Sequence, residues 1–179
     1  MKEPDVLAPL VARAAGGDTD ATTALIRATQ RDVMRFLSSM APAGDVEDLT
    51  QETFIRVVRA LPGFAGRSTV RTWLFAIARR VAADHARAAA RRPRITVFPD
   101  GRIPAGAGRS RFEEHHALTG LIAGLAEERR EAFVLTQVAG LSYAEVAEIC
   151  ACPIGTVRSR VARARDDLVT ALRAAREAG

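Results

Sequence analysis

The sequence predicts an all-α protein of two small helical domains joined by a flexible linker. Apolar residues recur at helical spacing along most of the 179-residue chain, and no convincing alternating run indicates a strand. One internal stretch, rich in proline and glycine, interrupts this pattern. The composition, with 48% hydrophobic and 26% charged residues, is typical of a globular rather than a disordered protein.

The first domain is expected over residues 20–92, after an N-terminal segment of residues 1–19. Three apolar stripes at i, i+3, i+4 and i+7 spacing predict its helices. The stripes are Val33, Phe36, Leu37 and Met40; Val46, Leu49, Thr53 and Val57, with Asp45 near the cap; and Val70, Leu74, Ile77 and Val81. Pro62, Gly63 and Gly66 separate the second helix from the third.

Residues 93–112 are the expected linker, since they hold three prolines, three glycines and few core residues. Fully extended, such a segment reaches about 65 Å at roughly 3.3 Å per residue. That is nearly two turns of B-DNA, at about 34 Å each. The sequence thus predicts two helical modules on a tether.

The second domain is expected over residues 113–179. Its apolar stripes are Leu118, Leu121, Ile122 and Leu125, followed by Phe133, Val134 and Val138. Gly140 ends the helix that carries the later stripe, and Ser142 with Glu145 forms a capping box that begins another. This helix runs to about Cys150, and Pro153 suits the first position of the next helix. Two short helices so joined predict a helix-turn-helix.

The last helix separates apolar from polar residues. Val157, Val161, Ala164 and Leu168 are expected to face inward. The outward residues are Thr156, Ser159, Arg160 and Arg163, with Arg158 flanking. Guanidinium and hydroxyl groups at the start of a helix suit the edges of bases in a major groove. The alternative is a solvated, arginine-rich amphipathic helix.

Charge is distributed unevenly. The chain has a net charge of +5, which favours an anionic partner such as nucleic acid or a lipid surface. Between residues 67 and 94, eight arginines stand against the single acid Asp84, a local charge of +7. Arg80, Arg87 and Arg91 share a helix face, which predicts a polyanion-binding surface beside a loop that carries Phe64, Arg67 and Ser68. Trp73, near the start of this helix, is expected in the core.

The preceding helix has the opposite charge. Asp45, Asp48 and Glu52 share one face beside Gln51 and form a local acidic patch in a basic chain. This patch is either a binding surface or a solvated helix face whose carboxylates lie near the positive end of the helix dipole.

The sequence disfavours several other classes. No apolar run approaches the roughly 18 residues that span a membrane, and no signal peptide is evident, so a cytoplasmic protein is expected. Cys150 and Cys152 are too few and too close for a disulfide framework. They lack zinc-knuckle spacing with His85, His115 and His116, so reduced, partly buried thiols are expected and no metal or cofactor.

Three segments in combination resemble a known family. They are DLTQETFIRV (48–57), RTWLFAIARRVAADHAR (71–87) and LSYAEVAEICACPIGTVRSRVARAR (141–165). On these the chain resembles the extracytoplasmic-function (ECF) sigma factors of the sigma-70 family, most like the sigma factor C type. The resemblance covers roughly residues 20–92 and 113–173. It implies a sigma2-like helical bundle and a sigma4-like helix-turn-helix domain, in a subunit that directs core RNA polymerase to promoters.

The resemblance also implies a role for each surface. The helix with Asp45, Asp48, Leu49, Gln51 and Glu52 would bind the clamp coiled coil of the largest polymerase subunit. The −10 element would be bound, and a flipped base held, by Phe64, Arg67, Ser68, Arg71, Arg80, Arg87 and Arg91. The −35 element would be bound by Thr156, Arg158, Ser159, Arg160 and Arg163, while another polymerase subunit contacts the same domain. Arg80 stands where the family often has Asn, and Ala162 where many relatives have a larger residue.

Two other classes of protein remain as alternatives. An ordinary DNA-binding regulator would bind promoter duplex tightly by itself, whereas a sigma factor needs polymerase. An enzyme such as a recombinase or nuclease would need a serine backed by arginines or convergent carboxylates; Ser38 and Ser39 have only Arg35 nearby in the sequence, so no enzyme is expected. Control could come from an anti-sigma factor, or from the two domains occluding each other.

Overall fold

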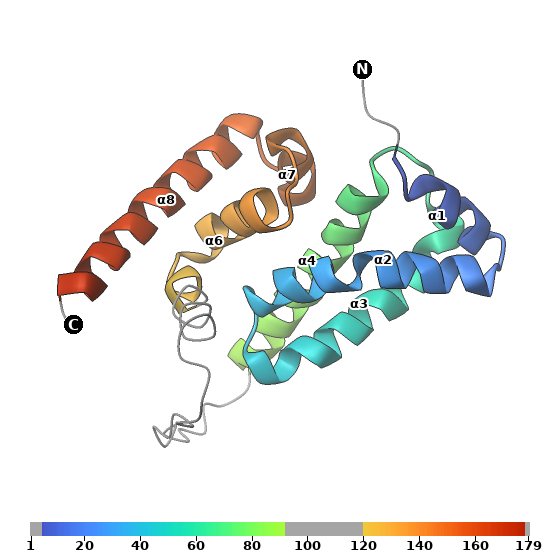
Figure 1. Ribbon diagram of the computed structural model, residues 1–179, viewed down its shortest axis with the longest axis horizontal. Coiled ribbons are helices and arrows are strands. Elements are labelled where there is room, and N and C mark those ends of the chain that lie inside the picture. The colour runs from blue at the N-terminus through green and yellow to red at the C-terminus, as the bar shows by residue number, and fades with distance from the viewer. Residues whose placement is uncertain (1–4, 92–119, 178–179) are drawn as a thin grey trace.

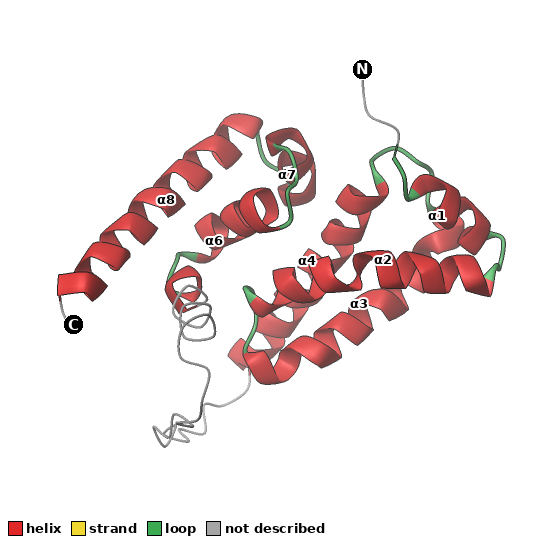
Figure 2. Cartoon of the chain, in the orientation of Figure 1, coloured by secondary structure: helices red, strands yellow, loops and turns green. Residues whose placement is uncertain are grey.

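The computed structural model of the chain describes residues 5–91 and 120–177. Helices joined by loops and turns make up these two ranges, and no strand occurs within them (Figure 2), which confirms the predicted fold class. The α-helices with both ends inside these ranges are α1 (Ala8–Ala15), α2 (Thr19–Ser38), α3 (Val46–Ala60), α4 (Val70–Arg91), α6 (Glu127–Phe133), α7 (Tyr143–Cys150) and α8 (Ile154–Glu177). The expected linker, 93–112, lies outside the described residues.

Helices α2, α3 and α4 pack on one another as the N-terminal bundle (Figure 1). Helix α2 begins after Asp18, whose carboxylate accepts a hydrogen bond from the backbone N–H of Ala21 at 2.9 Å. The predicted apolar stripes are buried as expected, except that Met40 lies beyond the end of α2 and is half-buried. Phe36 and Phe75 meet edge to face in the core, with ring centroids 5.6 Å apart.

Helix α1 is an element that the sequence analysis did not assign. It contacts α2 and the 3₁₀ turn η2 (Leu61–Gly63). Leu7, Val11 and Ala14 are buried in a cluster with residues of α2, η2 and α4. Their i, i+4 and i+7 spacing carries the helical period, so the signal for α1 is present in the sequence.

The C-terminal module consists of α6, α7 and α8. Helix α6 continues into a five-residue π-helical segment, η3 (Val134–Val138), and Gly140 follows with a φ of 70°. The predicted capping box of Ser142 and Glu145 is present at the start of α7. Helix α8 begins at Ile154, so Pro153 precedes the first helical position instead of occupying it, and its carbonyl accepts the N–H groups of the first turn.

The two modules are in contact. Helix α4 packs against α7, and α2 packs against η3. One buried apolar cluster includes Phe75 and Ala78 from the bundle as well as Leu135 and Ile149 from the C-terminal module. Figure 1 shows α6 and α7 lying beside α2 and α4, with α8 on the outer side.

Candidate protein and nucleic-acid interfaces

The acidic face of α3 is only partly available to a partner. Asp48 and Gln51 are exposed, whereas Leu49 is 7% exposed and packs into the core. The Glu52 carboxylate accepts a hydrogen bond from Nε of Arg56 at 2.7 Å. Asp45 Oδ2 lies 3.1 Å from His85 Nε2 on α4. The Leu49 side chain therefore belongs to the interior rather than to a binding surface.

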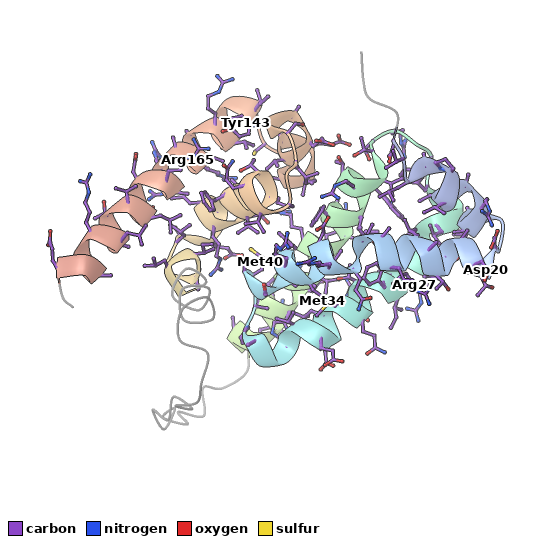
Figure 3. All side chains as sticks on the ribbon, viewed as in Figure 1. Asp20, Arg27, Met34, Met40, Tyr143 and Arg165 are labelled. Carbon is purple, nitrogen blue, oxygen red and sulfur yellow. The ribbon has the colours of Figure 1, made fainter. Side chains whose placement is uncertain are left out.

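An apolar groove of about 810 Å³ runs beside this face, between α2 and α3. Met34, labelled in Figure 3, lies on α2 and is 38% exposed; Ile55 and Val58 on α3 are 38% and 42% exposed. Glu47 and Gln51 also line the groove. The sequence analysis selected the carboxylates and missed these apolar residues. The signal was available, because Ile55 and Val58 lie off the buried stripe of α3.

A chain of charges connects α3 to the basic helix α4. Arg56 donates to Glu52 and, through Nη1, to Asp84 Oδ2 at 2.7 Å. Asp84 also accepts a hydrogen bond from Arg87. The hydrogen bond from Arg56 has the largest effect on the pKa of Asp84. Burial opposes it, but the further bond from Arg87 adds to it, and the pKa of Asp84 is lowered. The acid in this basic stretch is therefore ionised and partly neutralises Arg87.

The candidate −10 residues lie in and beside the loop that leads into α4. Arg67 in the loop and Arg80, Arg87 and Arg91 on α4 are exposed, while Phe64 and Ser68 are half-buried. The rings of Phe64 and Trp73 pack with centroids 4.9 Å apart, and Trp73 is half-buried rather than fully in the core. A pocket of about 340 Å³ is formed by Phe64, Arg67, Ser68, Trp73, Arg80 and neighbouring residues, together with Glu148 and Ile149 of α7.

Arg71 differs from the other residues of this set. Its guanidinium lies 2.8 Å from the Asp32 carboxylate and donates to the carbonyl of Ala139 at 2.7 Å. It also lies over the Phe75 ring, 5.8 Å from the centroid. In this arrangement Arg71 joins α2, α4 and the C-terminal module, and its donors are directed to protein acceptors rather than to a strand of DNA.

Further polar contacts connect the modules next to Arg71. Arg79 on α4 pairs with the buried carboxylate of Glu131 on α6. The hydroxyls of Thr69 and Thr72 each donate to Glu145 Oε1 at 3.0 Å. Burial opposes ionisation of Glu145, but these donors and those of Ser142 outweigh it, so the pKa of Glu145 is lowered. Glu145 thus caps α7 with one oxygen and binds Thr69 and Thr72 at the start of α4 with the other.

The cysteines are free thiols, as expected, and both are half-buried. Burial, with the nearby Glu131 carboxylate, raises the pKa of Cys150 to about 12. Its thiol donates to Glu131 at 3.5 Å. Within residues 5–91 and 120–177 no group of three or more histidine, cysteine or acidic residues could hold a metal ion; His115 and His116 are outside these ranges. No helix in the same ranges is long and apolar enough to cross a bilayer.

The −35 candidates divide into two groups on α8. The inward stripe is buried as predicted, and Arg158, Ser159 and Arg163 are exposed. Arg160 is half-buried, because its Nη2 bonds to Glu128 on α6 at 2.9 Å. Thr156 is also half-buried, and its carbonyl accepts the Ser159 hydroxyl. Arg158, Ser159 and Arg163 are therefore the side chains best exposed to a groove.

Comparison with known families finds matches over both modules. Sigma-70 region 2 matches residues 25–92, and Sigma-70, region 4 matches residues 115–168. The probable RNA polymerase sigma-C factor of Mycobacterium bovis is 48% identical over 167 residues, which cover 92% of this chain and 90% of that protein. The ECF RNA polymerase sigma-E factor of Escherichia coli K12 is 37% identical over 176 residues, which cover 88% and 89%.

Solved structures agree with the fold. CnrH in complex with the cytosolic domain of CnrY superposes with a TM-score of 0.74 at 28% identity, over 92% of this chain and 96% of that one. The sigma factor RpoE in complex with the anti-sigma factor NepR from Bartonella quintana gives 0.70 at 29% identity, over 83% and 94%. The chain belongs to the ECF sigma factors of the sigma-70 family, which direct RNA polymerase to specific promoters to initiate transcription.

Proposed function

We propose that the exposed part of the α3 acidic face and the adjoining α2–α3 groove form the surface that binds the clamp coiled coil of core polymerase. The observation that carries this assignment is the combination of exposed Asp48 and Gln51 with exposed Met34, Ile55 and Val58. Apolar contact would supply most of the affinity, and the carboxylate would select a basic partner helix. Leu49 supports this surface from inside the bundle.

Asp48→Lys combined with Val58→Asp tests this assignment. The double variant should reduce co-purification with bacterial core polymerase by at least tenfold, because it reverses a charge and places a carboxylate in an apolar contact. Asp20→Lys is the matched control, since Asp20 is an exposed carboxylate on α2 outside the groove. Circular dichroism checks folding. Equal polymerase binding by the double variant and the wild type would refute the assignment.

For promoter DNA we propose a division between the two modules. Residues 20–92 form the sigma2-like domain, in which the loop and α4 bind the −10 element through Phe64, Arg67, Ser68, Arg80, Arg87 and Arg91. Residues 113–179 form the sigma4-like domain, in which Arg158, Ser159 and Arg163 contact the −35 element, joined to the first by residues 93–112. Run-off transcription with core polymerase, with and without the chain, tests the whole proposal.

Arg71, Thr156 and Arg160 have protein partners or partial cover in this structure, so we propose that they reach DNA only after side chains or modules rearrange. The chain is further proposed to act in the cytoplasm without catalysing a reaction itself. Among its structural neighbours, CnrH is in complex with the cytosolic domain of CnrY, and the sigma factor RpoE is in complex with the anti-sigma factor NepR. This supports an anti-sigma partner for this chain, which should compete with core polymerase in a pull-down.

A further inference from the structure

The N-terminal segment holds both ends of the loop between α3 and α4. Leu61 at the start of this loop is 2% exposed, and Val70 at its end is 1% exposed. Both belong to the buried cluster that contains Leu7 and Val11. Phe64, between them, packs against the same cluster. Figure 1 shows α1 beside the start of α2, with the loop passing close to it on the way to α4.

Asp5 adds a hydrogen bond across 65 positions of the sequence. Its Oδ2 accepts from the backbone N–H of Val70 at 2.6 Å, while its Oδ1 accepts from the N–H of Leu7 at 3.1 Å. Val70 is the first residue of α4, where backbone N–H groups lack acceptors within the helix. A carboxylate at this position satisfies one such group and interacts favourably with the helix dipole. One side chain therefore caps α4 and tethers it to the start of α1.

The residue that forms the second cap of α4 also bonds to the other module. Thr69 Oγ1 accepts from the N–H of Thr72 at 3.1 Å, but the same hydroxyl bonds to Glu145 in the C-terminal module. When the modules separate, this threonine loses a partner. Asp5 lies within the N-terminal module, so its bond to Val70 persists in both arrangements. Like the apolar cluster of Leu7, Val11, Leu61 and Val70, it constrains the loop without using any residue of the C-terminal module.

We propose that Asp5 is a positioning residue for −10 recognition, acting through the Val70 amide to hold the loop that carries Phe64, Arg67 and Ser68. The inference rests on the proposed −10 function of this loop. It gives the first residues of the chain a role in promoter specificity. Asp5 itself touches neither DNA nor polymerase.

The first experiment measures the loop directly in the full-length chain. Asp5→Ala should speed hydrogen exchange in peptides covering residues 61–72 on the order of tenfold, as loss of a helix cap does. It should also shift the emission of Trp73, the single tryptophan, which packs on Phe64. Asp5→Asn keeps a neutral acceptor and should restore part of both signals.

Asp18→Ala is the matched control, because Asp18 caps α2 through the Ala21 N–H in the same way but does not touch the loop. It should leave both loop signals unchanged. Unchanged exchange and emission in Asp5→Ala would overturn the inference, as would an equal response to Asp18→Ala.

The second experiment measures promoter-sequence specificity, with each variant bound to bacterial core polymerase. Promoter duplex libraries randomised over the −10 or the −35 positions are the probes. Asp5→Ala should reduce enrichment of the preferred −10 sequence on the order of tenfold and leave −35 enrichment unchanged. Equal loss at both elements, or no loss at −10, would overturn the inference. If the wild type itself showed no −10 preference, the proposed function would fail, and the exchange experiment would still decide whether Asp5 holds the loop.

Discussion

At the scale of single residues, backbone conformation sets the shape of the helix-turn-helix. Gly140 ends the segment before α7 with a φ of 70°, and Ala151 ends α7 with a φ of 50°. Both lie in the left-handed region, which glycine adopts without penalty and alanine does not. A β-carbon at Gly140 would meet no atom within 4 Å, so its cost there would be backbone strain alone.

Exchanging these two residue types should therefore have opposite effects. Ala151→Gly should stabilise the chain by roughly 0.5–1 kcal/mol, because relief of the left-handed strain exceeds the entropy that glycine adds to the unfolded state. Gly140→Ala should destabilise it by about 1 kcal/mol for the same reason. Urea denaturation followed by circular dichroism measures both. Changes of the same sign in the two variants would contradict this explanation.

At the scale of elements, packing decides which arginines of α8 are available. The buried stripe of Val157, Val161, Ala164 and Leu168 orients the helix, and Glu128 on α6 holds Arg160. Arg163 belongs neither to the buried stripe nor to the ion pair with Glu128, and it is exposed. The same logic applies to α4, where Asp32 and Ala139 hold Arg71 while Arg80 remains exposed.

Arg163→Ala should weaken promoter binding by the assembled holoenzyme by roughly 1–3 kcal/mol, as loss of a base contact does. Arg173→Ala is the control, since Arg173 is an exposed arginine farther along α8. Quantitative DNA binding on promoters with intact and scrambled −35 elements measures the effect. An equal loss on scrambled sequences would indicate a phosphate contact instead of base recognition.

At the scale of the whole molecule, the two modules cover part of each other's candidate surfaces. Residues of α7 line the pocket beside the candidate −10 loop, and Arg71, Arg79 and Thr72 use acceptors in the C-terminal module. The α2–α3 groove is lined by residues of those two helices alone. The modules thus contact each other, as the occlusion hypothesis from the sequence requires, but the acidic face of α3 that it invoked is not among these contacts; Arg79 on α4 meets Glu131 on α6 instead.

Thr72→Val combined with Glu131→Gln should loosen the contact between modules, because it removes a hydroxyl donor and an ionic acceptor. The radius of gyration from small-angle scattering should increase. Thr170→Val is the control, as its hydroxyl bonds within α8. An unchanged radius of gyration in the double variant would show that these contacts do not hold the modules together.

The contact between the modules, which includes the hydrogen bonds of Thr69 and Thr72 to Glu145, should weaken at low pH. The folded-state pKa of Glu145 lies below its ordinary value of 4.5, so the stability it contributes is present above that pH. It is lost as the pH falls through the folded pKa. Acidification below about pH 4.5 should therefore increase the radius of gyration of the wild type. The increase should be smaller in the double variant, because its contact between the modules is already weakened.

Three segments of the sequence determined the family, and the sequence by itself also determined most helices of both modules, the capping box and the inward stripe of α8. These depend on residues up to about eleven positions apart, where helical geometry brings side chains together without reference to the rest of the chain. Helix α1 has the same helical spacing of apolar residues, in Leu7, Val11 and Ala14, although it was not among the predicted helices. The outcome for Leu49, buried on a face expected to bind, shows that a motif can mix surface and core residues.

Only the tertiary structure decided which charges are engaged and by what. Arg71 with Asp32, Arg79 with Glu131, Glu145 with Thr69, and Asp5 with Val70 join residues 39 to 76 positions apart. Charge counting treats every arginine as equivalent, because periodicity does not encode which distant helix will lie alongside. Packing of the apolar faces brings these helices together, and the polar side chains at their edges then find their partners.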